Sequence, residues 1–274
     1  MKKILHRTIV TLFAIFVFPQ CNGGEKAGEV KLTITGSSTV APLVMDIAKR
    51  FESEYPKVRV DVQTGGSSRG IGDARSGLAE IGMASRALKG DESDLNAHRL
   101  AMDGVCMIAH RDNPVTSLSA EQIVAIYTGK TKNWKDLGGQ DKPIVVANKA
   151  EGRATLEVFL EYFKIDSADI RADVIVGENQ QAIKTVAGNM DAIAYVSIGT
   201  SAYEADNGTP IRLLSMDDVS PSNAAVADGS FPIARPLNLV IKGEATGVAK
   251  SFLDYALSSK VNDLVEKHLF IPVE

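Results

Sequence analysis

The chain has 274 residues, of which 45% are apolar and 23% charged, with 30 Lys and Arg, 34 Asp and Glu, and two cysteines. The apolar content and the near balance of charge exclude a disordered chain, a collagen and a basic nucleic-acid-binding protein. The length suits one large domain or two ordinary ones with buried cores. Two cysteines cannot build a disulfide framework.

The first 20 residues have the pattern of a secretory signal peptide. Lys2, Lys3 and Arg7 flank the apolar run 8–18, and the segment has no acidic residue. The run is too short to cross a bilayer. Removal of the first 20 residues would leave 27 basic residues, three fewer than 30, against 34 acidic ones, which is a net charge of −7. We therefore expect an acidic protein that is exported to the periplasm or the cell surface.

Cys21 falls where signal cleavage is expected, and residues 21–29 have the composition of a tether. The arrangement resembles a lipoprotein signal, in which the cysteine is acylated and anchors the protein to a membrane face. Pro19 and Gln20 replace the small residues that are usual there, so ordinary cleavage nearby, leaving a free thiol, is the alternative. Cys106 lies in an apolar stretch without a partner cysteine and is expected to be a buried structural thiol.

From residue 30 onward, strand and helix patterns alternate. Apolar runs and period-two alternation predict strands at 30–35, 58–62, 81–84, 104–109, 144–147, 174–176, 193–196 and 237–241. Apolar residues at helical spacing predict helices at 40–51, 71–78, 119–129, 156–163, 182–187, 248–257 and 261–267. The third of these begins with the capping-box spacing of Ser119 and Gln122. This alternation predicts an α/β fold with a mostly parallel sheet between helices.

Three strand-to-helix junctions, at 36–39, 65–70 and 151–155, place glycine and hydroxyl residues where a helix begins. The start of a helix presents unpaired N–H groups at the positive end of its dipole, and such ends bind anions. Each junction alone is explained as well by Ser and Thr capping their own helix. Three junctions in one chain favour a shared site for an oxyanion.

Other chemistries find little support in the sequence. Residues 66–70 fit G-x-S-x-G, with Ser68 as a nucleophile, but too few strands precede it for a hydrolase sheet, and no histidine stands in a suitable loop. Ile71-Gly72 follows this loop where a P-loop needs Lys and Ser or Thr. The histidines have no metal-ligand spacing. We expect no enzymatic activity, no metal and no cofactor.

A set of motifs, taken together and in order, resembles one protein family. The motifs are Thr35-Gly36-Ser37-Ser38-Thr39-Val40, Thr64-Gly65-Gly66-Ser67-Ser68-Arg69-Gly70-Ile71, Ala84-Ser85-Arg86, Met102-Asp103-Gly104, Ile126-Tyr127-Thr128-Gly129-Lys130 with Asn133-Trp134, and Phe231-Pro232-Ile233-Ala234-Arg235-Pro236-Leu237. The sequence from about residue 31 to the C-terminus resembles the phosphate-binding proteins of bacterial phosphate ABC transporters, which are periplasmic-type solute receptors.

The resemblance implies a two-lobed α/β clamshell of type II-like topology, with mixed, mostly parallel sheets flanked by helices. One lobe would comprise 30–107 and 236–274, and the other 108–235. The chain would cross between them near His110-Arg111 and near Arg235-Pro236. The implied function is to bind inorganic phosphate between the lobes and to deliver it to the permease subunits of an ABC transporter. We expect a monomer that binds no nucleic acid.

The resemblance also implies a phosphate site, carried over by motif position. The implied residues are Ser38, Thr39, Ser67, Ser68, Arg86, Asp103, Lys149, Gly152, Arg153, Ala154 and Thr155. Ser38 and Thr39 would use hydroxyl and backbone N–H groups, and Arg86 would supply positive charge. Asp103 would accept the proton that phosphate carries near neutral pH and sulfate lacks. The alternative for Asp103 is a turn cap or an ion pair with Arg99 or Arg86.

The third loop departs from the family pattern, which often reads Gly-Ser-Gly-Thr. Here Gly152-Arg153-Ala154-Thr155 has arginine for serine and alanine for the second glycine. Arg153 would supply charge as a bidentate donor, or it would point to solvent while Lys149 or Arg86 carries the charge. The ligand is therefore expected to be phosphate, with sulfate or molybdate as alternatives and a secreted phosphatase or esterase as a more distant one.

Acylation of Cys21 can be tested by fractionation. If the thiol carries lipid, Cys21→Ala should move the protein from the membrane fraction to the soluble fraction, because the acyl chains supply the membrane affinity. Immunoblots of both fractions measure the distribution. Equal partitioning of the two proteins would contradict acylation.

Overall fold

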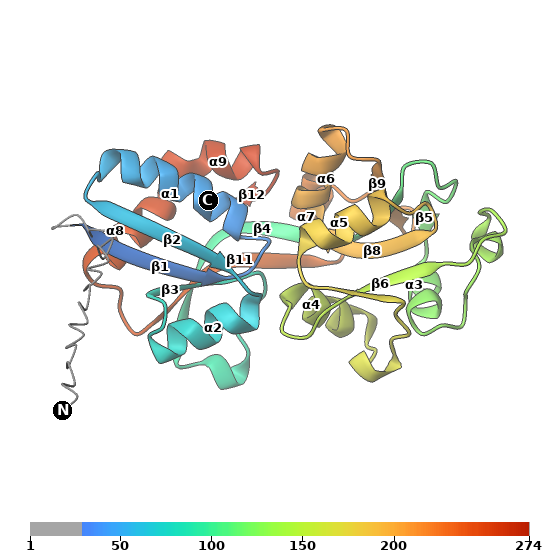
Figure 1. The fold of residues 1–274 in the computed structure, drawn as a ribbon, viewed down its shortest axis with the longest axis horizontal. Coiled ribbons are helices and arrows are strands. Elements are labelled where there is room, and N and C mark those ends of the chain that lie inside the picture. The colour runs from blue at the N-terminus through green and yellow to red at the C-terminus, as the bar shows by residue number, and fades with distance from the viewer. Residues whose placement is uncertain (1–28, 274) are drawn as a thin grey trace, which may run out of the picture.

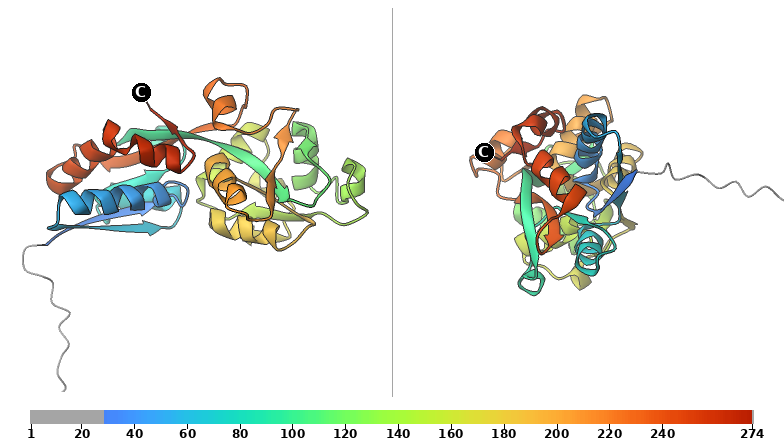
Figure 2. Two further views of the ribbon diagram at one scale, coloured as in Figure 1. Left: turned by 90° about the horizontal axis from the view of Figure 1, so that it is seen from above. Right: turned by 90° about the vertical axis from the view of Figure 1, so that its left-hand side faces the viewer.

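The structure, a computed structural model, describes residues 29–273, which form two lobes joined by two long strands (Figure 1). The strands β4 (Leu95–His110) and β11 (Ala234–Lys242) pair antiparallel and run from one lobe into the other (Figure 2). Their register shifts between Leu237 and Asn238. The signal peptide and Cys21 lie outside the described residues. The two-lobed α/β architecture is as the sequence predicts.

The first lobe is a sheet with helices on both faces. Its strands are β1 (Val30–Gly36), β2 (Val58–Thr64) and β3 (Ile81–Ala84), in the order β2-β1-β3-β11-β4, and β1 runs parallel to β2 and β3. Its helices are α1 (Ala41–Glu54), α2 (Ser67–Ser76), α8 (Gly247–Ala256) and α9 (Asn262–Lys267). Side chains of α1, α8 and α9 share one core, and Ile71 of α2 packs with Val240 on the opposite face.

The second lobe continues the same sheet through β8, β6 and β7. Strand β6 lies between β8 and β7 and runs parallel to both. Its strands are β5 (Ser117–Leu118), β6 (Val145–Lys149), β7 (Val174–Val176), β8 (Ala192–Ser197), β9 (Ile211–Leu213) and β10 (Ser215–Met216). Its helices are α3 (Ala120–Tyr127), α4 (Ala154–Phe163), α5 (Asn179–Ala187), α6 (Ile198–Asp206) and α7 (Asn223–Ala227). The C-terminal β12 (Ile271–Pro272) pairs with β4. The sheet is thus parallel towards each end and antiparallel around β4 and β11.

Short 3₁₀ helices complete the fold at Gly90–Glu92, Trp134–Leu137, Ser167–Asp169 and Ser259–Val261. The capping box predicted from Ser119 and Gln122 is confirmed at the start of α3, where the Ser119 hydroxyl accepts from the Gln122 N–H. Across the described chain, helices fall short of the length and apolarity that a membrane span requires.

Two separate hydrophobic cores mark where the chain passes between the lobes. One core contains residues from 32–101 and 237–270, and the other contains residues from 105–233. Strand β4 therefore passes between them at 102–104. The crossing expected at His110-Arg111 is wrong, because β4 continues to His110 and pairs there with Ile211 inside the second lobe. The lobe boundaries themselves stay a prediction.

The loop expected at 65–70 is shorter than predicted, because helix α2 already begins at Ser67. Gly66 makes this early start possible, since its φ of 98° turns the chain sharply after β2 in a way that few other residues allow. The hydroxyl residues of this junction therefore lie in the first turn of the helix. There they face the other lobe.

Gly70 and Gly72 in α2 provide a matched test of this packing. A Cβ at Gly70 would lie 2.5 Å from the Thr35 carbonyl oxygen and 2.7 Å from Gly36 Cα, whereas a Cβ at Gly72 would meet nothing within 4 Å. Gly70→Ala should lower the free energy of unfolding by about 1–3 kcal/mol, because backbone atoms must move. Gly72→Ala should raise it by up to about 1 kcal/mol through helix propensity. Denaturant unfolding measures both, and equal effects would contradict the close packing.

Candidate functional site

A small polar cavity lies between the two lobes. Its lining combines the ends of β1 and β3 and the start of α2 in the first lobe with the starts of α4 and α5 in the second. The lining residues are Ser37, Ser38, Thr39, Gly66, Ser67, Ser85, Lys149, Arg153, Ala154, Thr155, Gly177 and Asn179. This set contains hydroxyl, amide and cationic side chains and no carboxylate. The structure thus brings the three predicted junctions together around one cavity.

The helices that begin at this cavity differ in how their first N–H groups are satisfied. Before α1, the Ser37 hydroxyl accepts from the Thr39 and Val40 N–H groups over 3.2 and 3.4 Å. In the described chain, the N-cap residues of α2 and α4, Gly66 and Arg153, make no side-chain capping hydrogen bond. Self-capping therefore explains the junction before α1 but not the other two, where the helix N-termini present partial positive charge towards the same small volume.

Direct contacts across the cavity hold the lobes together. The Ser68 N–H donates to the Gly152 carbonyl oxygen over 3.3 Å, and the Asn179 Nδ2 donates to the Thr39 Oγ1 over 2.9 Å. Gly152 adopts a φ of 76°, which turns its carbonyl towards α2. The structure is thus a closed arrangement, in which the two lobes touch each other beside the cavity.

Lys149 is the buried cation of the cavity. Its side chain is 3% exposed, and its Nζ donates to the Asn179 Oδ1 over 3.0 Å, without a carboxylate partner among the described residues. Burial is the main reason that its pKa falls from 10.5 to about 7, and the charges of Arg235 and Arg153 lower it further. An anion in the cavity would supply the partner that Lys149 lacks.

Arg153 also lines the cavity, but its charge is already paired. The Arg153 Nη1 lies 2.6 Å from the Glu178 Oε1, and both side chains are partly exposed. Arg153 therefore neither points to solvent nor offers an unpaired guanidinium, the two alternatives for the altered third loop, and Lys149 is left as the cavity cation without a carboxylate partner among the described residues. Ala154 and Thr155 keep the helix N-terminus and the hydroxyl that the family pattern places there.

The structure does not bring Arg86 to the cavity. Its guanidinium makes two hydrogen bonds to Glu92, of 2.7 and 2.8 Å, and its Nε lies 3.0 Å from the Glu157 Oε2 of the other lobe. Lys89 also pairs with Glu157, and the Ser68 hydroxyl donates to that carboxylate over 3.1 Å. Arg86 and Ser68 therefore belong to a cluster of charges between the lobes, beside the cavity and not inside it.

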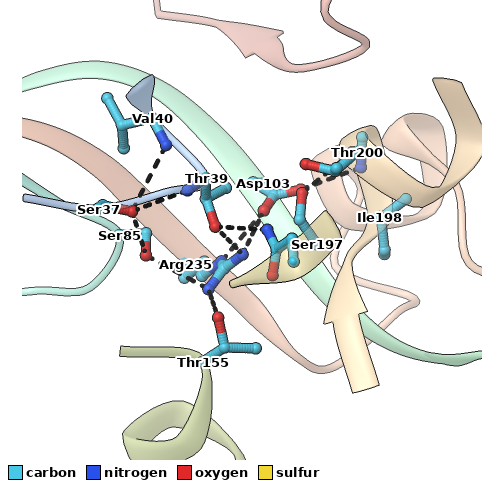
Figure 3. Close-up of polar contacts among 12 residues, drawn as sticks. Ser37, Thr39, Val40, Ser85, Asp103, Thr155, Ser197, Ile198, Thr200 and Arg235 are labelled. Atoms are coloured by element: carbon cyan, nitrogen blue, oxygen red, sulfur yellow. Dashed lines mark hydrogen bonds and ion pairs between the residues drawn. The ribbon is translucent and has the colours of Figure 1, made fainter. Parts of the chain in front are cut away.

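Asp103 is fully buried and is likewise absent from the cavity lining. Its Oδ2 accepts from the Arg235 Nε over 3.1 Å and from the Arg235 Nη2 over 2.8 Å, and its Oδ1 accepts from the Gly199 N–H over 3.2 Å (Figure 3). The ion-pair alternative describes these contacts, with Arg235 in place of the Arg99 or Arg86 that the sequence suggested.

Several residues of the site were missed at the sequence level. Arg235 is part of the motif 231–237, but the sequence indicated no role for it. Asn179 begins a fourth strand-to-helix junction after Gly177. That junction could have been found, because it has the same glycine at a strand end. The position of Arg235 could not, because only the pairing of β11 with β4 places it opposite Asp103.

Two α/β lobes that are joined by paired crossing strands, with a polar cavity between them, have the architecture of solute-binding proteins. Residues 23–260 match the PBP superfamily domain. The chain is 34% identical over 255 residues to the phosphate-binding protein PstS of Bacillus subtilis, covering 91% of this chain and 83% of the relative. The chain therefore belongs to the PBP superfamily and, within it, to the family of phosphate-binding proteins of ABC transporters.

Solved structures agree with this assignment. A putative phosphate ABC transporter substrate-binding protein from Clostridium perfringens, solved with bound phosphate, has a TM-score of 0.84 and 35% identity, covering 89% of this chain and all of that one. An ABC-type phosphate transport receptor from Vibrio cholerae has a TM-score of 0.68 and 26% identity at 89% and 100% coverage. Both support the two-lobed fold.

The depressed pKa of Lys149 predicts how stability depends on pH in buffer free of oxyanions. Between pH 7 and 10.5 the unfolded chain holds a proton on Lys149 that the folded protein lacks, so this group makes stability rise with pH. The slope is about 1.4 kcal/mol per pH unit within that window, and below it the full cost remains.

Lys149→Met should remove this contribution. The wild type should therefore gain stability relative to the variant as the pH rises from 7 towards 10. The free energy of unfolding of the variant minus that of the wild type should fall over this range. Denaturant unfolding of both proteins at several pH values measures it. A difference that stays constant over the range would contradict a depressed pKa of Lys149.

Proposed function

We propose that this protein is an extracytoplasmic receptor that binds inorganic phosphate between its lobes and delivers it to the membrane subunits of an ABC transporter. One observation carries the proposal: the cavity lining combines the uncapped N-termini of α2 and α4 with a buried lysine and contains no carboxylate. Such a site offers hydrogen-bond donors and positive charge to a small anion. The relatives named as phosphate-binding proteins agree with it.

In this proposal the phosphate contacts come from both lobes. Ser38, Thr39 and Ser67 would donate from the first lobe, and Lys149 and Thr155 from the second, with the backbone N–H of Ala154. Closure removes water from around the ion, and donors fixed on two rigid lobes replace that water. The roles of individual residues rest on their place in the lining.

We propose that Arg153, Gly152, Ser68 and Arg86 act at the edge of this site. Arg153 would add positive charge beside Glu178, while the contact of Ser68 with Gly152 would help to keep the lobes closed. Arg86 would act through Glu157 as part of the same closure. None of these roles needs the side chain to touch phosphate.

We propose further that the protein is not an enzyme. Ser68, the nucleophile of the hydrolase alternative, donates its hydroxyl hydrogen to Glu157. Of the described histidines, His110 and His268 contact Asp112 and Asp46 respectively. In residues 29–273, no group of three or more His, Cys, Asp and Glu is placed to hold a metal ion. Export, a lipid anchor on Cys21 and a monomeric state complete the proposal.

Calorimetry with phosphate, sulfate and molybdate tests the ligand. Phosphate should bind and should raise the melting temperature, because it binds the folded state only. It should also lower the radius of gyration in solution scattering, since closure over the ion brings the lobes together. A phosphoester hydrolysis assay serves as the test of the enzyme alternative. Tighter binding of sulfate, or no binding of phosphate, would contradict the proposal.

A further inference from the structure

Arg235 lies on β11 at the point where this strand passes from one lobe to the other. Its side chain is 1% exposed and does not line the cavity. Two of its N–H groups bind Asp103, which supplies the countercharge that a buried guanidinium requires. The remaining donors are directed at hydroxyl groups that do line the cavity (Figure 3).

These hydroxyl groups come from different lobes. The Arg235 Nη1 donates to the Thr155 Oγ1 over 2.9 Å and, more weakly, to the Ser85 Oγ over 3.4 Å, and the Nη2 donates to the Thr39 Oγ1 over 3.3 Å. Thr39 lies in the turn just before α1 in the first lobe, and Thr155 lies in the first turn of α4 in the second. One guanidinium thus contacts both sides of the cavity, and it can do so only while the lobes are closed.

The direction of these hydrogen bonds constrains the hydroxyl hydrogens. A guanidinium donates and never accepts, and a hydroxyl group has one hydrogen to donate. The Thr39 Oγ1 accepts from both Arg235 and Asn179, so its acceptor capacity is used. Its own hydrogen must therefore point to a different acceptor. The Thr155 oxygen accepts one hydrogen bond from Arg235, which cannot accept in return, so the Thr155 hydrogen is also free to be donated elsewhere.

We propose that Arg235 is a positioning residue that turns the hydroxyl groups of Thr39 and Thr155 into donors towards the bound anion. This inference rests on the proposed function, because it takes the ligand to be phosphate. Asp103 acts through Arg235 by fixing the plane of the guanidinium. Selection of an acceptor-rich ion then comes from the orientation of two hydroxyl groups, set by a residue that does not touch the ion.

The test compares the effect of Arg235→Gln in two backgrounds, with phosphate affinity measured by calorimetry. In the wild-type background the substitution should weaken binding about 10-fold or more, because both hydroxyl groups lose their fixed orientation. In the Thr39→Val/Thr155→Val background the effect should be at least about threefold smaller, because the two threonine hydroxyl groups are gone. The unpaired Asp103 carboxylate and the Ser85 hydroxyl, which accepts from the Arg235 Nη1 over 3.4 Å, contribute equally in both backgrounds. Valine keeps the shape of threonine, so the packing changes little.

A merely structural role of Arg235 would weaken binding by the same factor in both backgrounds, and that result would overturn the inference. Failure of the wild type to bind phosphate would overturn the proposed function itself, so the two failures are distinguishable. Arg212→Gln is the matched control, since its Nη1 donates to the Asn113 carbonyl oxygen away from the cavity. Affinity should stay within about twofold of wild type there.

Thermal unfolding without anions shows which variants are folded before binding is measured. If Arg235→Gln does not fold, Arg235→Lys takes its place, because lysine keeps the charge near Asp103 but cannot hold the fixed fork of donors. The same comparison between backgrounds then applies. A cost of Arg235→Lys that is equal in both backgrounds would again overturn the inference.

Discussion

The buried ion pair of Arg235 and Asp103 is the interaction on which the rest of the site depends. The two residues lie opposite each other on β11 and β4, where these strands pass from one core to the other. Loss of one partner from such a pair typically costs about 3–5 kcal/mol, because the other is left as an uncompensated buried charge. The pair therefore fixes the crossing strands against each other and orients the guanidinium towards the cavity.

The cavity has an excess of donors over acceptors, and this excess explains why it needs a ligand. Lys149 is buried and meets no carboxylate among residues 29–273, and three helices direct their N-termini to the same volume. In the closed state without an anion, these groups lose water and gain little in return. With an anion they gain charge-assisted hydrogen bonds, which are the stronger kind. The balance between open and closed lobes thus depends on whether the ion is present.

Much of the fold could be predicted from the sequence, because local patterns determine it. Apolar periodicity located α1, and the spacing of Ser119 and Gln122 located the start of α3. The junction residues Thr39, Ser67 and Thr155 were identified because a helix start is a local feature with its own chemistry. Arg86 and Arg235 could not be distinguished in this way. Which arginine reaches the hydroxyl groups of the cavity depends on strand pairing and on the acidic partner that each one meets, Glu92 or Asp103.

The two crossing strands also determine how faithfully the site is rebuilt after each opening. Because β4 and β11 are hydrogen-bonded to each other along the crossing, the joint can bend and twist while their register stays fixed. The lobes cannot slide past each other along the strand direction without breaking that ladder. Each closure therefore returns Thr39 and Thr155 to the same relative position, because the pairing of β4 with β11 fixes how the two lobes meet around the cavity.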